Sequence, residues 1–343
     1  MQFAFDEDQL AMTDAARVML VETCTPADLR HLLERNEAWD EARWNAIRDM
    51  GLVAMLAPED AGGLELAPVD LVGIAEAAGY VGLPEPLVEQ AGIVVPLLAS
   101  LADDRGWIER VIRGEVVAVG HPANPFVADA DTAGAFVLPH GAELHLVERE
   151  QVSLTLRHSV DTFRRLFTVD WSPSPETMVG SDWGQTADRG ALFTAAQLIG
   201  LGQRAIDLAV AYAKDRTQFG KPIGSYQAVK HLIASAQVKI EFARPVVHAA
   251  AAELPLDTFA SRARVAHAKI AAGDAADLAT RTAVQIYGAM GMTREADVHF
   301  FLKRTLALRY AWGTAFDHRA TVIERLNTRP TGPDMTFASR VPA

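Results

Sequence analysis

The stretch RTQFGKPIGSYQ, residues 216–227, combines residue types that could hold a diphosphate group. Arg216 closes an expected long helix, and Phe219 and Gly220 form a tight turn that exposes backbone donors. A guanidinium binds phosphate oxygens through two parallel hydrogen bonds, and the amide of Gln227 on the next helix could fix the orientation of the ligand. Phe219 could stack on an aromatic base or pack against a neighbouring helix. The same residues would also suit a helix end without a ligand, where a basic side chain is favourable to the helix dipole.

The stretch QIYGAMGMTRE, residues 285–295, is the second candidate for chemistry. Gln285 lies near the end of another expected helix, which Gly288 stops. The amide of Gln285 could reach a ligand beside that helix end, or it could donate a hydrogen bond there with no ligand present. The residue pattern leaves both possibilities open.

Other kinds of catalytic or metal site find no support in the sequence. The ten histidines are scattered, and none is spaced from a Cys, Asp or Glu as metal ligands are, so no metal site is expected. We expect His140, His145 and His318 to be ordinary hydrogen-bonded histidines. There is no nucleophile-elbow motif, no phosphate loop with a lysine and no Gly-x-Gly-x-x-Gly pattern.

The composition indicates a globular protein of two or three packed units. Of its 343 residues, 50% are apolar and 22% are charged. The formal net charge of -12 argues against nucleic acid or an anionic membrane surface as the main partner. Cys24 is the only cysteine, which excludes an internal disulfide framework. The start has no basic segment before an apolar core, and no apolar run approaches the roughly 20 residues that span a bilayer, so we expect a cytoplasmic protein.

Hydrophobic periodicity changes twice along the chain and predicts three domains and a tail. Apolar residues recur every three or four positions up to Gly114, then alternate in a short β unit, and return to helical spacing from about Gln185. The predicted domains are an N-terminal helical domain at 1–114, a reduced β domain at 115–184, a C-terminal four-helix bundle at 185–330 and a tail at 331–343.

The elements that must position the two stretches are long helices, preceded in the chain by short strands. Strands are expected at 142–148, 151–157 and 165–170. Helices are expected from Arg189 to Asp215, from an N-cap at Ser225 to about Pro245, from about Thr258 to Tyr287, and from about Glu295 to Arg325.

With this order of domains, the two stretches resemble the acyl-CoA dehydrogenase family of flavoproteins, whose chains read helical domain, β domain, four-helix domain. The resemblance covers the whole chain in layout and is most detailed from about Gly190 to Thr293, with a weaker match at residues 50–63. It implies a mainly α fold with a small β domain, and FAD as the cofactor. The passage GMTREADVHFFLKR, residues 291–304, is similar to the acyl-CoA dehydrogenases of bacterial steroid side-chain degradation, which include paired, heteromeric subunits.

In that family the first stretch belongs to one subunit and holds the adenosine-diphosphate end of the FAD bound by its neighbour. The resemblance implies cofactor-binding roles for six residues: Arg216, Gln218, Phe219, Gln227, Gln285 and Gly288. The family usually has two consecutive glycines in the second stretch. Here Ala289 replaces the second glycine, and its methyl group could crowd the approach to the ligand.

The part of the family site that meets the flavin ring has no counterpart in this sequence. The β domain of the family usually carries a Thr-Glu pair followed by Gly-Ser-Asp, whereas residues 117–131 read VAVGHPANPFVADAD. A Gly-Ser-Asp is present at 180–182, after the expected strands, and is interpreted as a linker into the bundle.

The glutamate that removes the α-proton in this family is also missing, so no catalytic residue is assigned. Trp312 stands at one family position of that base and Arg262 at the other, and neither side chain can accept the proton at neutral pH. Glu253 and Asp317 are nearby carboxylates, but each is expected to be a solvated surface charge.

The resemblance implies first a subunit that completes an FAD site across an interface, lacks its own catalytic base and works in a hetero-oligomer with a homologous acyl-CoA dehydrogenase subunit. A self-sufficient homo-oligomeric FAD-dependent enzyme with a displaced base is the second hypothesis. A degenerate structural homologue that binds neither flavin nor CoA is the third. The acyl group stays open, because an acyl pocket is lined by apolar residues that carry little information about the ligand.

Overall fold

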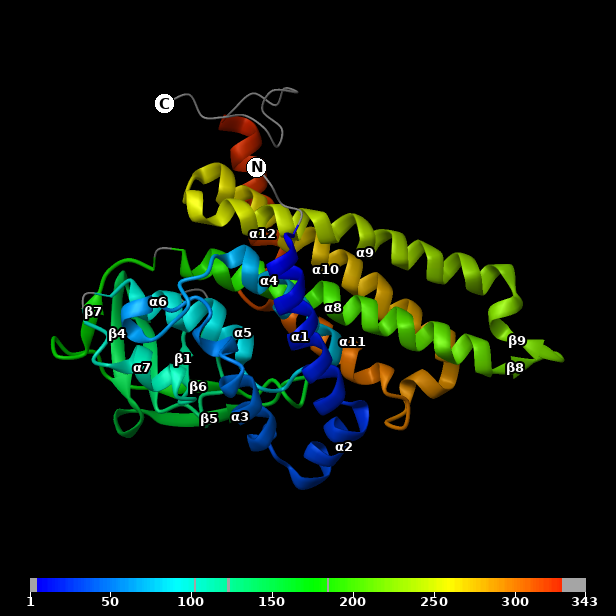
Figure 1. Ribbon diagram of the computed structural model, residues 1–343, viewed down its shortest axis with the longest axis horizontal. Helices are drawn as coiled ribbons and strands as arrows, with labels where there is room; N and C mark the ends of the chain where they lie inside the picture. The colour runs from blue at the N-terminus through cyan, green and yellow to red at the C-terminus, as the bar shows by residue number, and fades with distance from the viewer. Residues whose placement is uncertain (1–4, 102, 122–123, 184, 329–343) are drawn as a thin grey trace.

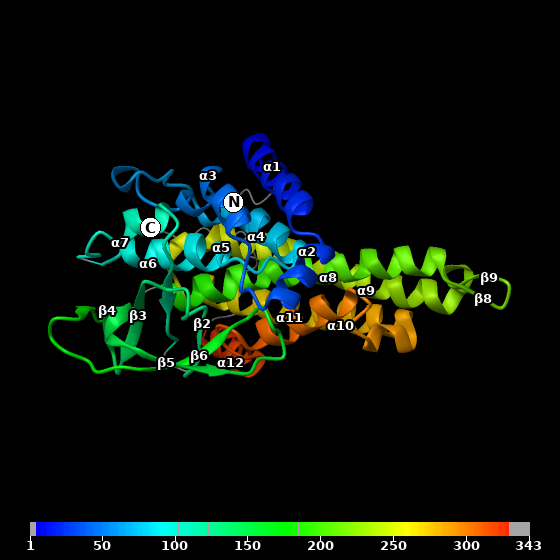
Figure 2. The same cartoon turned by 90° about the horizontal axis from the view of Figure 1, so that it is seen from below.

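The computed structural model describes residues 5–101, 103–121, 124–183 and 185–328 (Figure 1). Two helical parts are separated in the sequence by a small β unit. Seen from below, the N-terminal helices cover one side of the long C-terminal helices, and the β strands lie on the other side near one end (Figure 2). This confirms the mainly α fold with a small β unit. Within the described ranges, no helix is both long enough and apolar enough to cross a membrane.

The N-terminal part contains helices α1 to α7. The side chains of Asp6, Thr25 and Asp40 cap α1, α2 and α3 by accepting hydrogen bonds from backbone N–H groups of the first turn. α4 is buried along almost its whole length, and a π-helical turn at Gln90–Val94 joins α5 to α6. The bounds are α1 Glu7–Thr23, α2 Pro26–Arg35, α3 Glu41–Asp49, α4 Pro68–Val81, α5 Leu87–Glu89, α6 Val95–Ala99 and α7 Trp107–Ile112.

The β unit holds strands β1 to β7 in two small sheets, in the orders β1-β3-β4-β7 and β2-β6-β5. A two-residue turn joins β3 to β4, and it places His140 opposite Glu143 and Leu138 opposite His145. The three expected strands are present as β4, β5 and β6. The bounds are β1 Val117–Val119, β2 Val127–Ala128, β3 Ala135–His140, β4 Glu143–Glu148, β5 Ser153–Arg157, β6 Leu166–Asp170 and β7 Met178–Gly180.

The C-terminal part is built on three long helices, which run side by side in Figure 1. Alanine and other small or aliphatic side chains fill the space between them, and this allows close packing of the helix axes. The bounds are α8 Thr186–Asp215, α9 Gln227–Glu253, α10 Phe259–Tyr287, α11 Val298–Tyr310 and α12 Ala315–Thr328, with the two-stranded ribbon β8 Thr217–Gln218 and β9 Lys221–Pro222 between α8 and α9.

Two glycines let α4 and α8 pack backbone against backbone. A Cβ atom on Gly79 of α4 would lie 2.0 Å from the carbonyl oxygen of Gln197, and one on Gly200 of α8 would lie 1.9 Å from the carbonyl oxygen of Glu76. Neither position has room for any side chain, because the atoms in the way are backbone atoms. The N-terminal helices and the bundle are therefore in direct main-chain contact.

Several expected boundaries in the C-terminal part were wrong. Pro245 does not end α9, which continues to Glu253 because the residues after the proline are buried. Ser225 is not an N-cap, since it lies in a 3₁₀ turn and Tyr226 precedes the helix without a side-chain cap. The expected linker at 180–182 is shorter, because Gly180 pairs with Leu144 as the end of β7.

The expected last helix is two helices. α11 ends at Tyr310 and α12 begins at Ala315. Between them Trp312 and Gly313 have φ angles of 56° and 101°, which a right-handed helix does not allow. A Cβ on Gly313 would also approach the ring of His318 to 2.8 Å. The predicted tail at 331–343 lies outside the described residues.

The guanidinium of Arg304 joins all three parts of the molecule. It belongs to α11, donates to the backbone carbonyl of Leu83 after α4 at 2.8 Å, and forms an ion pair with Asp161 of the β unit. All of these groups are buried. Burial opposes the charge, but the Asp161 carboxylate raises the pKa of Arg304 above its already high usual value.

Replacing Asp161 by Asn should destabilise the protein by about 3–5 kcal/mol, because it removes the ion-paired carboxylate from the buried Arg304 guanidinium. Urea unfolding followed by circular dichroism measures the change. The matched control is Glu109→Gln, since Glu109 pairs with Arg113 on the surface, where both side chains are more than half exposed. That control should cost less than about 1 kcal/mol. Equal losses in the two variants would show that the Arg304 pair does not hold the parts together.

Candidate functional site

The far tip of the bundle carries the first candidate stretch. Arg216 is the C-cap of α8, the ribbon β8–β9 follows, and Gln227 is the first residue of α9. Phe219 and Gly220 make the turn of the ribbon with positive φ angles of 50° and 79°. The backbone of Phe219 is uncommon for a bulky residue, and its ring is 93% exposed.

The structure brings the second stretch to the same end of the bundle. The rings of Tyr212 and Tyr287 stack with centroids 4.1 Å apart and an interplanar angle of 14°. Tyr212 lies one helical turn before Arg216, and Tyr287 lies between Gln285 and Gly288. This stacked pair joins the ends of α8 and α10, so the two stretches form one surface, here called the bundle tip.

Every candidate cofactor-binding residue of the bundle tip is exposed: Arg216, Gln218, Phe219, Gln227, Gln285 and Gly288. Among the residues that the structure describes, none forms an ion pair or a side-chain hydrogen bond with Arg216. Figure 1 shows the tip, marked by β8 and β9, projecting beyond the rest of the molecule. The tip therefore offers a guanidinium, amides and an open turn to something outside this chain.

The chemistry of the bundle tip suits a diphosphate but provides only one wall of a binding site. A guanidinium and free backbone donors at a positive-φ turn both bind anionic oxygens. Gly288 has a φ of 62° and open space around it, so the backbone angle, and not crowding within this chain, requires the glycine. Ala289 is exposed, and no neighbour in the described chain crowds it.

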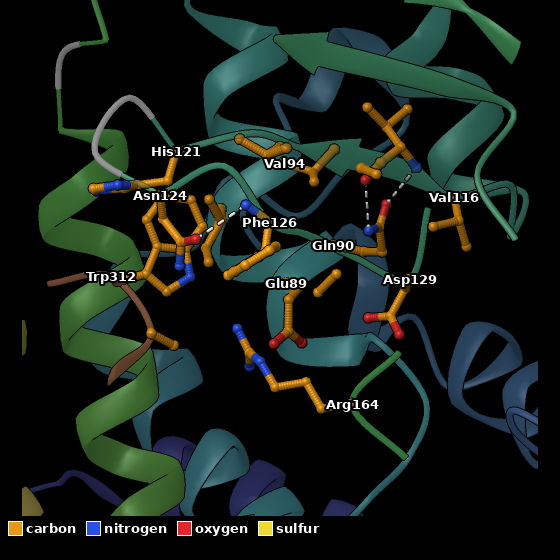
Figure 3. Close-up of a pocket in the computed structure, with 16 residues that line it drawn as sticks. Glu89, Gln90, Val94, Val116, His121, Asn124, Phe126, Asp129, Arg164 and Trp312 are labelled. Carbon is orange, nitrogen blue, oxygen red and sulfur yellow. Dashed lines mark hydrogen bonds between the residues drawn. The ribbon is translucent and has the colours of Figure 1, made fainter. Parts of the chain in front are cut away.

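A small pocket of about 50 Å³ lies where the N-terminal helices, the β unit and the bundle meet. Figure 3 shows side chains from all three parts pointing into it. Apolar residues of α5–α6 and β1 form its back wall, and the Gln90 side chain is fixed there by two hydrogen bonds of 3.0 Å to the backbone of Val117.

Trp312 closes one side of this pocket. Its indole packs on α8 at Gly190, where an added Cβ would lie 2.1 Å from the ring, and it meets the ring of His121 edge to face at 5.3 Å. His318 donates to the Trp312 carbonyl at 3.1 Å. The end of α11 just before it is held by the buried ammonium of Lys269, which donates to the Leu308 carbonyl at 2.9 Å. Trp312 is therefore a firmly held apolar wall.

Another side of the pocket is charged, and it could not be predicted because its residues come from three distant segments of the chain. Glu89, Asp129 and Arg164 line the pocket together. Burial, assisted by the charge of Glu89, raises the pKa of Asp129 to about 7. A carboxyl group that can hold or release a proton near neutral pH therefore lies in the pocket wall.

The other carboxylates that the sequence suggested lie elsewhere. Glu253 is buried and ion-paired with Arg264, so its expected position as a solvated surface charge was wrong. Asp317 is exposed as expected; hydrogen bonds from the backbone and side chain of Thr314 lower its pKa. Arg262 is exposed in the first turn of α10 and does not line the pocket.

Two of the histidines lie beside a carboxylate in the structure. His140, Glu143 and His145 place one potential metal-ligand atom each within 4.8 Å of one another. Their spacing in the sequence does not indicate this proximity, because the three residues come together through the β3–β4 hairpin and not along a helix. His145 and His318 are hydrogen-bonded, as expected.

Comparison with known proteins gives the family. Residues 6–115 match the model of the acyl-CoA dehydrogenase N-terminal domain, and residues 184–327 match that of the C-terminal domain. Acyl-CoA dehydrogenase IpdE2 of Mycolicibacterium smegmatis is 32% identical over 300 residues, which are 87% of this chain and 92% of IpdE2.

Acyl-CoA dehydrogenase FadE34 of Mycobacterium tuberculosis is 30% identical over 285 residues, 78% of this chain but only 39% of FadE34. The fold matches a chain in the crystal structure of the ChsE4-ChsE5 complex from Mycobacterium tuberculosis with a TM-score of 0.85 at 21% identity, covering 96% of this chain and 100% of that one. The family models together span most of the chain, and they confirm the resemblance seen in the sequence. The chain belongs to the acyl-CoA dehydrogenase family.

Proposed function

We propose that this chain is the subunit of a hetero-oligomeric acyl-CoA dehydrogenase that completes an FAD site across an interface and has no catalytic base of its own. The observation that carries the proposal is the contrast between its two half-sites. The six candidate cofactor-binding residues of the bundle tip are all exposed, whereas Trp312, which stands at one family position of the base, lines the pocket.

The residues of the bundle tip fit the adenosine-diphosphate end of FAD. Arg216 would bind the diphosphate, Phe219 and Gln218 would face the adenosine part, and Gln227 and Gln285 would orient it. FAD supplies a hydride acceptor when it is bound. The tip has no second wall within the described chain, so a partner subunit would have to supply the rest of the site.

The pocket also supports the proposal. Dehydrogenation of a thioester needs a carboxylate over the α-carbon to remove a proton. Trp312 has no group that can accept it, and its indole packs against α8 at Gly190. Arg262, at the alternative family position, lies on the surface.

Exposed apolar side chains of the bundle fit an oligomer. α9 exposes Leu232, Val238 and Phe242, and α12 buries none of its residues while it exposes Phe316, Ile323 and Leu326. Such surfaces usually mark protein–protein contacts. The ChsE4-ChsE5 structure is a complex of two different chains by its name, and more than half of FadE34 lies outside the region matched here. Both fit a chain that works beside a second unit.

A self-sufficient enzyme with a displaced base is the alternative that one observation favours. Asp129 lies in the pocket wall and its raised pKa of about 7 would suit a general base. Against this, Figure 3 shows Asp129 and Trp312 on different sides of the pocket. A degenerate homologue that binds no flavin would keep the fold but would have no use for the bundle tip.

Replacing Arg216 by Ala should weaken FAD binding by the purified hetero-complex about 10- to 100-fold, because a charge-assisted hydrogen bond is worth roughly 1.5–3 kcal/mol. Titration of the apo-complex with FAD, followed by flavin fluorescence, measures the affinity. The chain should stay folded, since Arg216 is exposed at a helix end.

The matched control is Lys214→Ala, which removes an exposed positive charge from the same last turn of α8. It should leave FAD affinity unchanged. An Arg216→Ala complex that binds FAD as tightly as the wild type would contradict the assignment and favour the degenerate homologue.

The isolated chain should show no acyl-CoA dehydrogenation even with added FAD, because the loss of a positioned base costs on the order of 10²–10⁴ in rate. Reduction of a ferrocenium-type acceptor with short, long and steroid-type acyl-CoAs is the assay. Trp312→Glu should not restore turnover, because the flavin-ring contacts are absent as well. Steady turnover by the wild-type chain that is lost in Asp129→Asn would overturn the proposal and establish the displaced base.

A further inference from the structure

The β3–β4 hairpin carries three potential metal ligands on one face. His140 ends β3, and it lies opposite Glu143, the first residue of β4. His145 is two residues further along β4, so it faces the same side of the sheet as Glu143. The pairing of the hairpin therefore brings two imidazoles and one carboxylate together without any further folding of the chain.

The distances from Glu143 to the two histidines are close to those of a zinc site, and all three ligand atoms lie within 4.8 Å of one another. The Nε2 atom of His145 lies 3.2 Å from Oε2 of Glu143, and the Nδ1 atom of His140 lies 3.8 Å from the same oxygen. Two ligands of a tetrahedral zinc ion are separated by about 3.4 Å, given metal–ligand distances near 2.1 Å. Since the His140 side chain is 60% exposed, a small rotation can bring it into range.

His145 is held as a metal-binding histidine usually is. Its side chain is only 2% exposed, and its Nδ1 atom lies 2.9 Å from the hydroxyl oxygen of Thr177. The Thr177 hydroxyl donates its single proton to the carbonyl of Ser174 at 3.0 Å, so it receives a hydrogen bond from Nδ1–H of His145. Such an outer hydrogen bond fixes the tautomer and leaves Nε2 as the ligand atom.

This tautomer makes the contact between His145 and Glu143 informative. A neutral imidazole with its proton on Nδ1 turns the lone pair of Nε2 toward the Glu143 carboxylate, and two electron-rich atoms repel each other at 3.2 Å. A cation between them removes the repulsion. The ring of Trp171 lies 5.1 Å from that of His145 and 6.5 Å from that of His140, and it shields one side of the cluster from water.

We propose that His140, Glu143 and His145 bind one divalent transition-metal ion of the zinc type, with water completing its coordination. Nitrogen and carboxylate ligands favour zinc and its neighbours over magnesium or calcium. The site lies on the β unit, among residues that take no part in the bundle tip or the pocket. It would tie the hairpin to β7 through Thr177 and so stabilise the first sheet.

Equilibrium dialysis of tag-free apo-protein against micromolar Zn²⁺ tests the proposal. One Zn²⁺ should bind per chain and raise the midpoint of thermal unfolding, while millimolar Mg²⁺ should do neither. His140→Ala removes an exposed ligand without affecting the fold and should weaken Zn²⁺ binding at least 10-fold. Thr177→Val, which removes only the outer hydrogen bond, should weaken it 10- to 100-fold.

The matched control is His158→Ala, an exposed histidine just after β5, which should leave Zn²⁺ affinity unchanged. Cu²⁺ should quench part of the tryptophan fluorescence, and that part should disappear in Trp171→Phe. A protein that binds no Zn²⁺ has a proton between His145 and Glu143 and overturns the proposal. Binding that His140→Ala leaves intact places the ion elsewhere and overturns it too. These results do not depend on whether the chain is a subunit of a dehydrogenase.

Discussion

The buried guanidinium of Arg304 is the constraint on which the arrangement of the molecule depends. A positive charge in an interior must be neutralised and hydrogen-bonded, and here the partners come from two other parts of the chain. Because Leu83 and Asp161 both contact this one side chain of α11, it ties the N-terminal helices and the β unit to the bundle. Glu89, Asp129 and Arg164 line the pocket, and they also line a second cavity that Arg304 borders.

The bundle tip lies at the end of α8, whereas the pocket lies near its start, where Trp312 packs on Gly190. The bundle tip exposes polar groups that no other part of the described chain covers. The pocket is lined by the indole of Trp312 on one side and by Glu89, Asp129 and Arg164 on another. In an enzyme that worked alone, a cofactor held by the tip could not reach the pocket of the same chain. The proposed function accounts for this separation, because a neighbouring subunit would bring its own groups to the bundle tip; α9 and α12 expose apolar side chains on the bundle surface.

The long helices, the strands β4, β5 and β6 and the position of the bundle tip could be predicted from the sequence, because they depend on periodicity and on local turn chemistry. The features that could not be predicted depend on contacts between distant segments. Pro245 is tolerated inside α9 because packing outweighs one lost hydrogen bond. The break at Trp312 follows from its contacts with α8. Asp129 and Glu89 come together only when the β unit folds against α5. His140 meets His145 only through the register of the β3–β4 hairpin.

The glycine contact between α4 and α8 also determines how the molecule can move. Gly79 and Gly200 each sit against main-chain atoms of the other helix, so neither helix can slide or rotate without a steric clash. The N-terminal helices and the bundle therefore behave as one rigid block. Any opening of the pocket for a large ligand must therefore involve a movement of the β unit, and that movement would break the ion pair between Asp161 and Arg304.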